Sequence, residues 1–236
     1  MNTTINLPDL SNIFYARQYA YDILRRFFIE EPSRDYLKHF VQQNMIHLFP
    51  FLEESEDLKE GIDLVTNYLK EFDVVNNENH FDNLHWDYTR MFIGPYEVPA
   101  PPWESVYVRK DRMIFQECTM DVRKSYNKFG FAASDDSIEA DDHIGLELDF
   151  VYHLNELCID SANKKSVHSI NEVNYLLNEQ QQFIKKHLSA FVPAFSQKVI
   201  DSADSQFYSG LARILNHYIK ADSQVLHELL NIDFVN

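Results

Sequence analysis

The sequence has 236 residues, of which 45% are hydrophobic and 14% aromatic. That length and composition are typical of a globular protein with one sizeable core, or with a large and a small subdomain. The formal net charge is −16 and no basic cluster interrupts the acidic background, which argues against nucleic acids and anionic membrane surfaces as partners. An acidic surface instead favours a basic peptide or protein segment.

The first residues have neither the positive charges nor the apolar core of a secretory signal, and no apolar run is long enough to span a bilayer. The two cysteines, Cys118 and Cys158, lie far apart in the sequence and follow no recognised spacing. Such a pair is typical of reduced thiols in a cytoplasmic protein rather than of a disulfide framework. We therefore expect a soluble, cytoplasmic protein.

Apolar residues recur at helical spacing along most of the chain, whereas strand-like alternation is scarce. The pattern predicts helices over residues 13–28, 33–40, 42–49, 56–72, 81–92, 112–129, 142–160, 170–187, 191–202 and 205–232. Ser11 or Asn12 is the expected N-cap of the first helix, and Asp141 is that of the helix at 142–160. The expected fold is an all-α, single-domain helical bundle over residues 1–236, without a sheet.

A proline-rich loop divides this predicted bundle in the middle. Four prolines fall within residues 95–102 and exclude a helix there, because each fixes φ and lacks a backbone donor. Trp103 follows the prolines, while Trp86 and Tyr88 lie on the predicted helix before them. Rigid prolines beside aromatic rings form an apolar slot at a low entropic cost. We expect Trp86, Tyr88 and Trp103 to line such a slot.

The most acidic part of the chain comes after the loop. Residues 129–163 contain nine acidic residues and no lysine or arginine. The sequence Glu-Ala-Asp-Asp-His at 139–143 leads into a predicted helix, where Glu147 lies four residues after His143 and is expected to touch it. Two interpretations remain open: a solvated, well-capped helix start, or a carboxylate-rich lip that receives a cationic ligand.

No catalytic or cofactor motif accompanies these features. The five glycines are too widely spaced for a phosphate-binding loop, and no nucleophile elbow occurs. His143 and Glu147 form a single pair at four-residue spacing, which is more typical of an ion pair than of a metal site, and the Glu-x-x-His motifs of metal-binding bundles are missing. We therefore predict a protein that is not an enzyme and holds neither a metal nor a cofactor.

Several segments resemble one known family. Residues 84–95 (LHWDYTRMFIGP), 99–107 (PAPPWESVY) and 139–148 (EADDHIGLEL), together with the spacing between them, are similar to the TorD/DmsD-like redox-enzyme maturation chaperones. Residues 187–195 and 206–211 are similar to the C-terminal part of that family. The resemblance therefore extends over nearly the whole chain.

The resemblance implies an all-helical cytoplasmic chaperone that binds the twin-arginine signal peptide of a molybdenum-cofactor oxidoreductase precursor until the cofactor is inserted. Carboxylates pair well with arginine, and an apolar groove suits the hydrophobic stretch of a leader. The expected peptide-binding residues are Trp86, Tyr88, Pro101, Pro102, Trp103, Glu104, Ser105, Glu139, Asp141, Asp142, His143 and Glu147. The family's acidic motif reads Glu-Pro-x-Asp-His, and Ala140 in place of that proline predicts a looser loop.

Other functions remain open from the residues alone. One is an assembly subunit that acts on a redox enzyme without reading the leader, and another is a small nucleotide-binding helical switch or enzyme. GTP binding has been proposed for family members, but no phosphate-binding loop supports it here. The resemblance names the leader and the body of the precursor as partners, without identifying the client. A homodimer also remains open, because family members can exchange helices between protomers.

Overall fold

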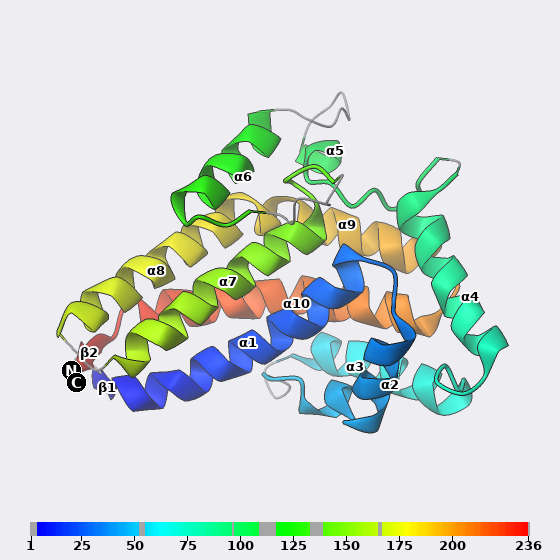
Figure 1. The fold of residues 1–236 in the computed structure, drawn as a ribbon, viewed down its shortest axis with the longest axis horizontal. Helices are drawn as coiled ribbons and strands as arrows, with labels where there is room; N and C mark the ends of the chain where they lie inside the picture. The colour runs from blue at the N-terminus through cyan, green and yellow to red at the C-terminus, as the bar shows by residue number, and fades with distance from the viewer. Residues whose placement is uncertain are drawn as a thin grey trace.

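The computed structural model describes residues 4–51, 55–95, 97–108, 117–132, 139–164 and 167–235. Over these residues the chain is a bundle of helices around one core, and the predicted all-α fold is confirmed (Figure 1). The elements follow in this order: β1 (Thr4–Asn6), α1 (Leu7–Ile29), α2 (Arg34–Gln42), η1 (Met45–Leu48), α3 (Glu56–Glu71), α4 (Glu78–Tyr88), η3 (Thr89–Ile93), α5 (Ser105–Val108), α6 (Glu117–Lys128), α7 (Ile144–Asn163), α8 (Val167–Lys186), α9 (Leu188–Ser202), α10 (Gln206–Leu229) and β2 (Asp233–Val235).

Short polar side chains start several of these helices. The side chains of Ser33, Ser55, Asn77 and Ser205 each accept a backbone N–H in the first turn of α2, α3, α4 and α10. Each bond satisfies a donor that the helix itself leaves unpaired. By contrast, α1 begins at Leu7, so the predicted N-cap at Ser11 or Asn12 is wrong, and both residues lie inside the helix.

One small sheet corrects the expectation of a chain without strands. β1 and β2 pair in parallel, with Thr4 opposite Asp233 and Asn6 opposite Val235, and they bring the two ends of the chain side by side (Figure 1). Strands of three residues are too short to show alternation in the sequence. Their pairing follows from where α1 starts and α10 ends, which only the packed bundle determines.

The long helices pack in a continuous layer. α1 lies along α7, α7 contacts α8, and α10 packs against both α3 and α9 (Figure 1). At Gly61 and Gly210 the backbones of α3 and α10 approach closely, since a Cβ on Gly61 would lie 2.9 Å from the carbonyl oxygen of Gly210. A larger residue at either position would force the two helices apart. Among the described helices, none combines the length and apolar character that a membrane span requires.

A buried ion pair joins three of these helices. Arg17 on α1 donates from Nε to Asp222 on α10 at 2.6 Å and from Nη1 to Asn155 on α7 at 2.8 Å, and Tyr21 donates to the same Asp222 at 2.7 Å. Arg17 and Asp222 are completely buried. Because each charge is both paired and hydrogen-bonded, the core tolerates them, although removal of one partner would leave the other uncompensated.

The middle of the chain departs from regular helix, as predicted. α4 continues into the π-turn η3, and the following loop is tied back by a hydrogen bond from the Ala100 N–H to the Met91 carbonyl at 3.2 Å. The short helix α5 follows the prolines, where no helix was predicted. Of the helix predicted at 112–129, residues 117–128 form α6 and residues 112–116 lie outside the described residues. Residues 133–138, in the acidic stretch at 129–163, also lie outside them.

Candidate peptide-binding site

The proline-rich loop and the start of α7 are joined through their backbones. Trp103 and His143 form an antiparallel bridge, and the Ile144 N–H donates to the Pro102 carbonyl at 2.7 Å. The two segments that stood out in the sequence therefore form one structure. Each satisfies backbone groups of the other, so the loop fixes where α7 begins.

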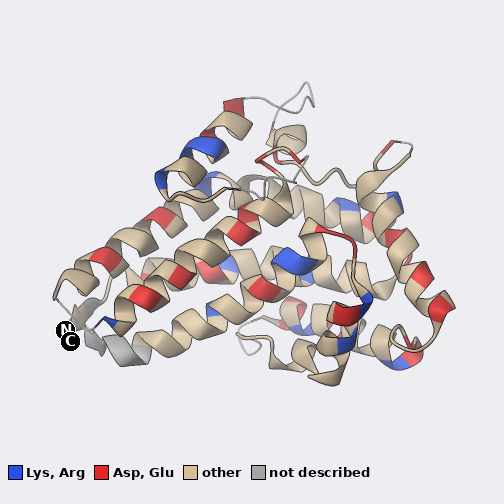
Figure 2. Ribbon diagram, viewed as in Figure 1, with Lys and Arg blue, Asp and Glu red and all other residues tan. Residues whose placement is uncertain are grey.

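The C-terminal end of α1 packs directly against this point. A Cβ on Gly145, in the first turn of α7, would clash with the Cα of Ile29, so only glycine permits this approach. Glu31, which follows α1, faces α4 and η3, where it accepts the Thr89 hydroxyl at 2.7 Å and lies 3.4 Å from the Nδ1 atom of His85. In Figure 2 the segment after α1 is acidic at this position.

Trp103 and Glu139 form the outer edge of the joined segments. The indole Nε1 of Trp103 donates to the Glu139 carboxylate at 3.2 Å, and Glu139 is exposed. Burial raises the pKa of the nearby Tyr88 hydroxyl, and the carboxylates of Glu31 and Glu139 raise it further.

Asp142 faces the interior rather than a ligand. One carboxylate oxygen accepts the Ser105 N–H at 2.9 Å, and the other accepts the Thr119 hydroxyl at 3.0 Å. The side chain is fully buried. Its lone pairs are directed at donors from α5 and α6, so it fixes the positions of these two short helices.

His143, not Asp141, caps α7. The Nδ1 atom of His143 accepts the Gly145 N–H at 3.1 Å, and the helix begins at Ile144 rather than at the predicted residue 142. Histidine is not among the favoured N-cap residues, which is why the sequence pointed to the aspartate instead. Burial lowers the pKa of His143 to about 4, although the carboxylate of Asp142 opposes this effect. The ring is therefore neutral at pH 7, as a cap acceptor must be.

Asp141 and Ala140 shape the turn before α7. The carboxylate of Asp141 forms an ion pair with Arg123 of α6, and its carbonyl accepts the Tyr126 hydroxyl at 2.9 Å. Ala140 is buried, and its carbonyl accepts the His143 N–H at 3.0 Å. The replacement of the family's proline by Ala140 therefore leaves a closed, hydrogen-bonded turn in this chain.

Two buried glutamates complete the interior of the site. Glu104 lies 2.9 Å from the Nδ1 atom of His187. Burial raises the pKa of Glu147 well above its ordinary value, and the carboxyl groups of Glu104 and Asp142 raise it further. Glu147 accepts no hydrogen bond from an N–H or hydroxyl group of the described residues, and its carboxyl group shares a hydrogen bond with that of Glu104. The predicted contact with His143 is a backbone hydrogen bond, from the Glu147 N–H to the His143 carbonyl at 3.0 Å.

The predicted site residues thus fall into two groups. Those that are exposed or half-exposed are Trp86, Pro101, Trp103, Glu139 and Asp141. Those that are buried are Tyr88, Pro102, Glu104, Ser105, Asp142, His143 and Glu147. The carboxylate-rich surface at the start of α7 is therefore smaller than the sequence suggested, because Asp142 and Glu147 turn inward. Acidic residues are instead spread over α1, α4, α7 and α8 (Figure 2).

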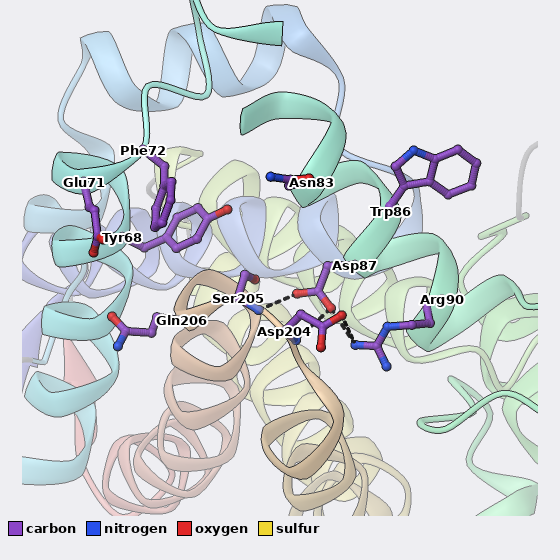
Figure 3. A pocket seen from close by; sticks show the side chains of 10 residues that line it. All are labelled: Tyr68, Glu71, Phe72, Asn83, Trp86, Asp87, Arg90, Asp204, Ser205 and Gln206. Carbon is purple, nitrogen blue, oxygen red and sulfur yellow. Dashed lines mark hydrogen bonds and ion pairs between the residues drawn. The ribbon is translucent and has the colours of Figure 1, made fainter. Parts of the chain in front are cut away.

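Trp86 lines a separate pocket of about 640 Å³ between α3, α4 and the start of α10 (Figure 3). Its lining residues are Tyr68, Glu71, Phe72, Asn83, Trp86, Asp87, Arg90, Asp204, Ser205 and Gln206. Tyr88 belongs to the core instead, where its ring lies 4.9 Å from that of Phe92. The predicted slot lined jointly by Trp86, Tyr88 and Trp103 is therefore not formed.

Asp87 organises one wall of this pocket. Its buried carboxylate accepts the N–H groups of Asp204 and Ser205, at 3.0 and 2.9 Å, just before α10. It also accepts a hydrogen bond from Arg90 at 3.0 Å (Figure 3). The spacing of Asp87 and Arg90 on a predicted helix could have revealed their pairing. Nothing in the sequence signals the contacts with residues more than a hundred positions away.

Metal-binding and thiol chemistry find little support at these positions. Within the described part of the chain, no group of three or more His, Cys, Asp or Glu side chains could hold a metal ion. Cys118 and Cys158 are both free, in agreement with the prediction of two thiols, and burial raises the pKa of Cys158 to about 12. A thiol with so high a pKa is a packing residue rather than a nucleophile.

Comparison with known proteins identifies relatives over most of the chain. The model of the family described as "Nitrate reductase delta subunit" matches residues 53–197. "Chaperone protein TorD" of Vibrio atlanticus is 27% identical over 203 residues, which cover 86% of this chain and 91% of that protein. The TorD protein of Aliivibrio salmonicida is 24% identical over 220 residues, covering 93% and 99%. "Tat proofreading chaperone DmsD" of Salmonella typhi is 28% identical over 133 residues, covering 56% and 57%.

Proposed function

Since this chain belongs to the nitrate reductase delta subunit family, we propose that it is a maturation chaperone of a molybdenum-cofactor oxidoreductase. The resemblance to TorD and DmsD that the sequence indicated is confirmed by the family match and by the relatives. In this proposal the protein binds the twin-arginine leader of the precursor in the cytoplasm and delays export until the cofactor is in place. It carries out no reaction of its own.

The observations that support leader binding best are a pocket with aromatic side chains at Trp86 and an exposed carboxylate, Glu139, hydrogen-bonded to Trp103. The pocket at Trp86, whose side chain is 63% exposed, offers aromatic walls to the hydrophobic stretch of a leader. The chain then leads through the proline-rich loop to Trp103, whose indole donates to the exposed Glu139. Carboxylates next to an aromatic ring are suited to arginine, which both pairs and stacks.

The two groups of site residues have different roles in this proposal. The exposed group, which includes Trp86, Trp103 and Glu139, contacts the peptide. The buried group, which includes Asp142 and His143, holds the loop and the start of α7 in position. A supporting layer of this kind is what keeps a recognition surface rigid.

The test is calorimetry with a twin-arginine leader peptide from a molybdenum-cofactor oxidoreductase of the same organism. We expect the affinity to fall as salt is added, because exposed charges are screened over roughly 8 Å at physiological ionic strength. Replacement of both peptide arginines by glutamine should cost about 2–4 kcal/mol, since one hydrogen bond to a charged group contributes about 1.5–3 kcal/mol. Salt-independent binding that ignores the arginines would contradict the proposal.

Two matched pairs of variants locate the binding surface. Trp86→Ala should weaken binding, whereas Tyr175→Ala removes an exposed aromatic ring on α8, outside the proposed surface, and should not. Glu139→Gln should weaken binding, whereas Glu156→Gln removes an exposed carboxylate elsewhere on α7 and should not. Equal effects within both pairs would show that only overall charge and hydrophobicity matter.

A second candidate follows from the description of the family itself, which names a subunit of nitrate reductase. In that case the protein assembles with the body of a redox enzyme and does not read a leader. Purification from the native cell followed by mass spectrometry separates the two functions. Recovery of a precursor that retains its leader supports the chaperone, and recovery of a leaderless enzyme alone supports the assembly subunit.

A further inference from the structure

Arg90 lies between two carboxylates in the pocket that Trp86 lines. Its Nη2 atom lies 3.0 Å from the Asp87 carboxylate and 2.9 Å from that of Asp204, and it also donates to the carbonyl of Ser202 (Figure 3). Arg90 is the one basic side chain among the described lining residues. The pocket therefore already contains a guanidinium group, and that group belongs to the protein itself.

The two carboxylates around Arg90 differ sharply in exposure. The side chain of Asp87 is 1% exposed, and it is held in place by two backbone N–H groups in addition to Arg90. The side chain of Asp204 is 76% exposed, and that of Arg90 is 43% exposed. Exposed ion pairs contribute little to stability and open readily, so the contact of Arg90 with Asp204 can be exchanged for another.

The surroundings of Arg90 fit a particular ligand. Tyr68, Phe72 and Trp86 supply aromatic surface to the pocket, and Glu71 supplies a third carboxylate (Figure 3). A volume of about 640 Å³ accommodates several side chains of a bound peptide. The complementary ligand is a peptide segment in which an arginine is followed by apolar residues, because it places a guanidinium at the acids and hydrocarbon against the rings.

We propose that Arg90 is an intramolecular competitor for the arginine-binding position of this pocket. A peptide arginine displaces Arg90 from Asp204, while the apolar residues behind it pack against Trp86. This inference rests on the proposed function, because the peptide is the twin-arginine leader. While Arg90 pairs with Asp204, the pocket cannot bind a peptide arginine. The measured association constant is therefore the intrinsic constant multiplied by the fraction of molecules in which Asp204 is free. Arg90 thereby rejects peptides that bring apolar surface without a guanidinium.

The experiment compares Arg90→Gln with Arg34→Gln. Arg34 has a similar exposure of 46%, pairs with Glu78 and Asp82, and does not line the pocket, so its variant controls for the loss of one positive charge. We expect Arg90→Gln to bind the leader peptide about three- to tenfold more tightly, and Arg34→Gln to change binding by less than about twofold. The gain should disappear for a peptide whose arginines are replaced by glutamine.

A second substitution tests the acidic position directly. Adding Asp204→Asn to Arg90→Gln should abolish the gain, because the exposed carboxylate is the group that the peptide arginine takes over. Asp204 contributes only its backbone N–H to Asp87, so this change leaves that hydrogen bond intact. If Arg90→Gln lowers the melting temperature, Arg90→Lys keeps a charge beside Asp87, and an intermediate gain is then expected.

The outcomes separate this inference from the proposed function. If the wild type binds the leader and Arg90→Gln binds it equally or more weakly, the competitor role is overturned and the chaperone function stands. If neither binds the leader, the proposed function fails. The probe acetyl-Arg-Leu-amide then tests the pocket alone, through the NMR shift of the Trp86 indole, assigned with Trp103→Phe. A larger response in Arg90→Gln than in the wild type supports the competitor, and no response in either overturns it.

Discussion

The buried cluster at the start of α7 and the open pocket at α4 use the same kinds of residue in opposite ways. In the cluster, Asp142 is fully buried, and donors from Ser105 and Thr119 occupy its oxygens. In the pocket, Asp204 is exposed, and its partner, Arg90, is 43% exposed. A carboxylate whose donors come from the fold stabilises the fold, and a carboxylate with an exchangeable partner is available to a ligand.

The cluster also contains two titratable groups whose pKa values burial moves in opposite directions. Burial lowers the pKa of His143 to about 4 and raises that of Glu147 well above its ordinary value. Both shifts favour the neutral form, since a charge in a low-dielectric interior is costly. The region therefore carries pH-dependent stability. The following variants test this contrast.

The largest effect is expected for Asp142→Ala. It removes the acceptor of the buried Ser105 N–H, so the free energy of unfolding should fall by about 3 kcal/mol. Urea denaturation at neutral pH measures it. If Asp142 and His143 contacted the leader, as the sequence suggested, changes at these residues would cause a modest loss of stability and a selective loss of leader binding. A loss of stability below about 1 kcal/mol together with loss of binding would restore that earlier interpretation.

The second effect concerns His143→Asn, which preserves an acceptor for the cap but removes the titration. Because the folded-state pKa of His143 is lowered, the wild type gains stability that is present above the ordinary pKa of 6.5 and is lost as the pH falls toward about 4. We expect the variant to avoid a loss of about 2–3 kcal/mol over that range. Urea denaturation at pH 7, 5.5 and 4 measures the free energy of unfolding of both proteins. The same dependence on pH in the variant and the wild type would contradict a buried neutral imidazole.

The third effect has the opposite dependence on pH. The folded-state pKa of Glu147 is raised, so its contribution to stability is fully present below the ordinary value of 4.5 and is lost as the pH rises through the folded-state pKa. Glu147→Gln should therefore match the wild type near pH 4 and be the more stable of the two at pH 8, because an amide does not ionise. Glu156→Gln, at an exposed position of the same helix, is the control and should show no such divergence.

The smallest effect is expected when an aspartate of the pocket is replaced by alanine. Asp204→Ala removes an exposed carboxylate whose ion pair with Arg90 lies at the surface, so the free energy of unfolding should change by less than about 0.5 kcal/mol. Thermal unfolding beside Asp142→Ala gives the comparison. A loss as large as that of Asp142→Ala would show that the Arg90 contact is structural and not exchangeable.

The arrangement of the helices was largely predictable, and their ends were less so. The helix over 56–72 was expected almost as it is observed, because its apolar spacing and the serine before it agree. The helix predicted over 142–160 begins two residues later, at Ile144, because the buried His143 is its N-cap. The parallel pairing of β1 and β2 could not be foreseen, because it joins the two ends of the chain.

The candidate site was only partly predictable. The joining of the proline-rich loop to the start of α7 matches the two segments chosen from the sequence. The shared slot of Trp86 and Tyr88 was wrong for a reason that the sequence did contain, since residues two positions apart point to different faces of a helix. The pocket itself was missed, because Asp204 and Ser205 reach it from a distant turn.

The sequence by itself determined the helical class, the family resemblance and the excess of negative charge, because periodicity, motif spacing and composition are properties of neighbouring residues. Only the tertiary structure decided which carboxylates are available. Asp142 is withdrawn from solvent by donors on α5 and α6, and Asp204 is left exposed opposite Arg90. Burial and pairing depend on groups far along the chain, and the same residue type therefore stabilises the fold in one place and faces the solvent in another.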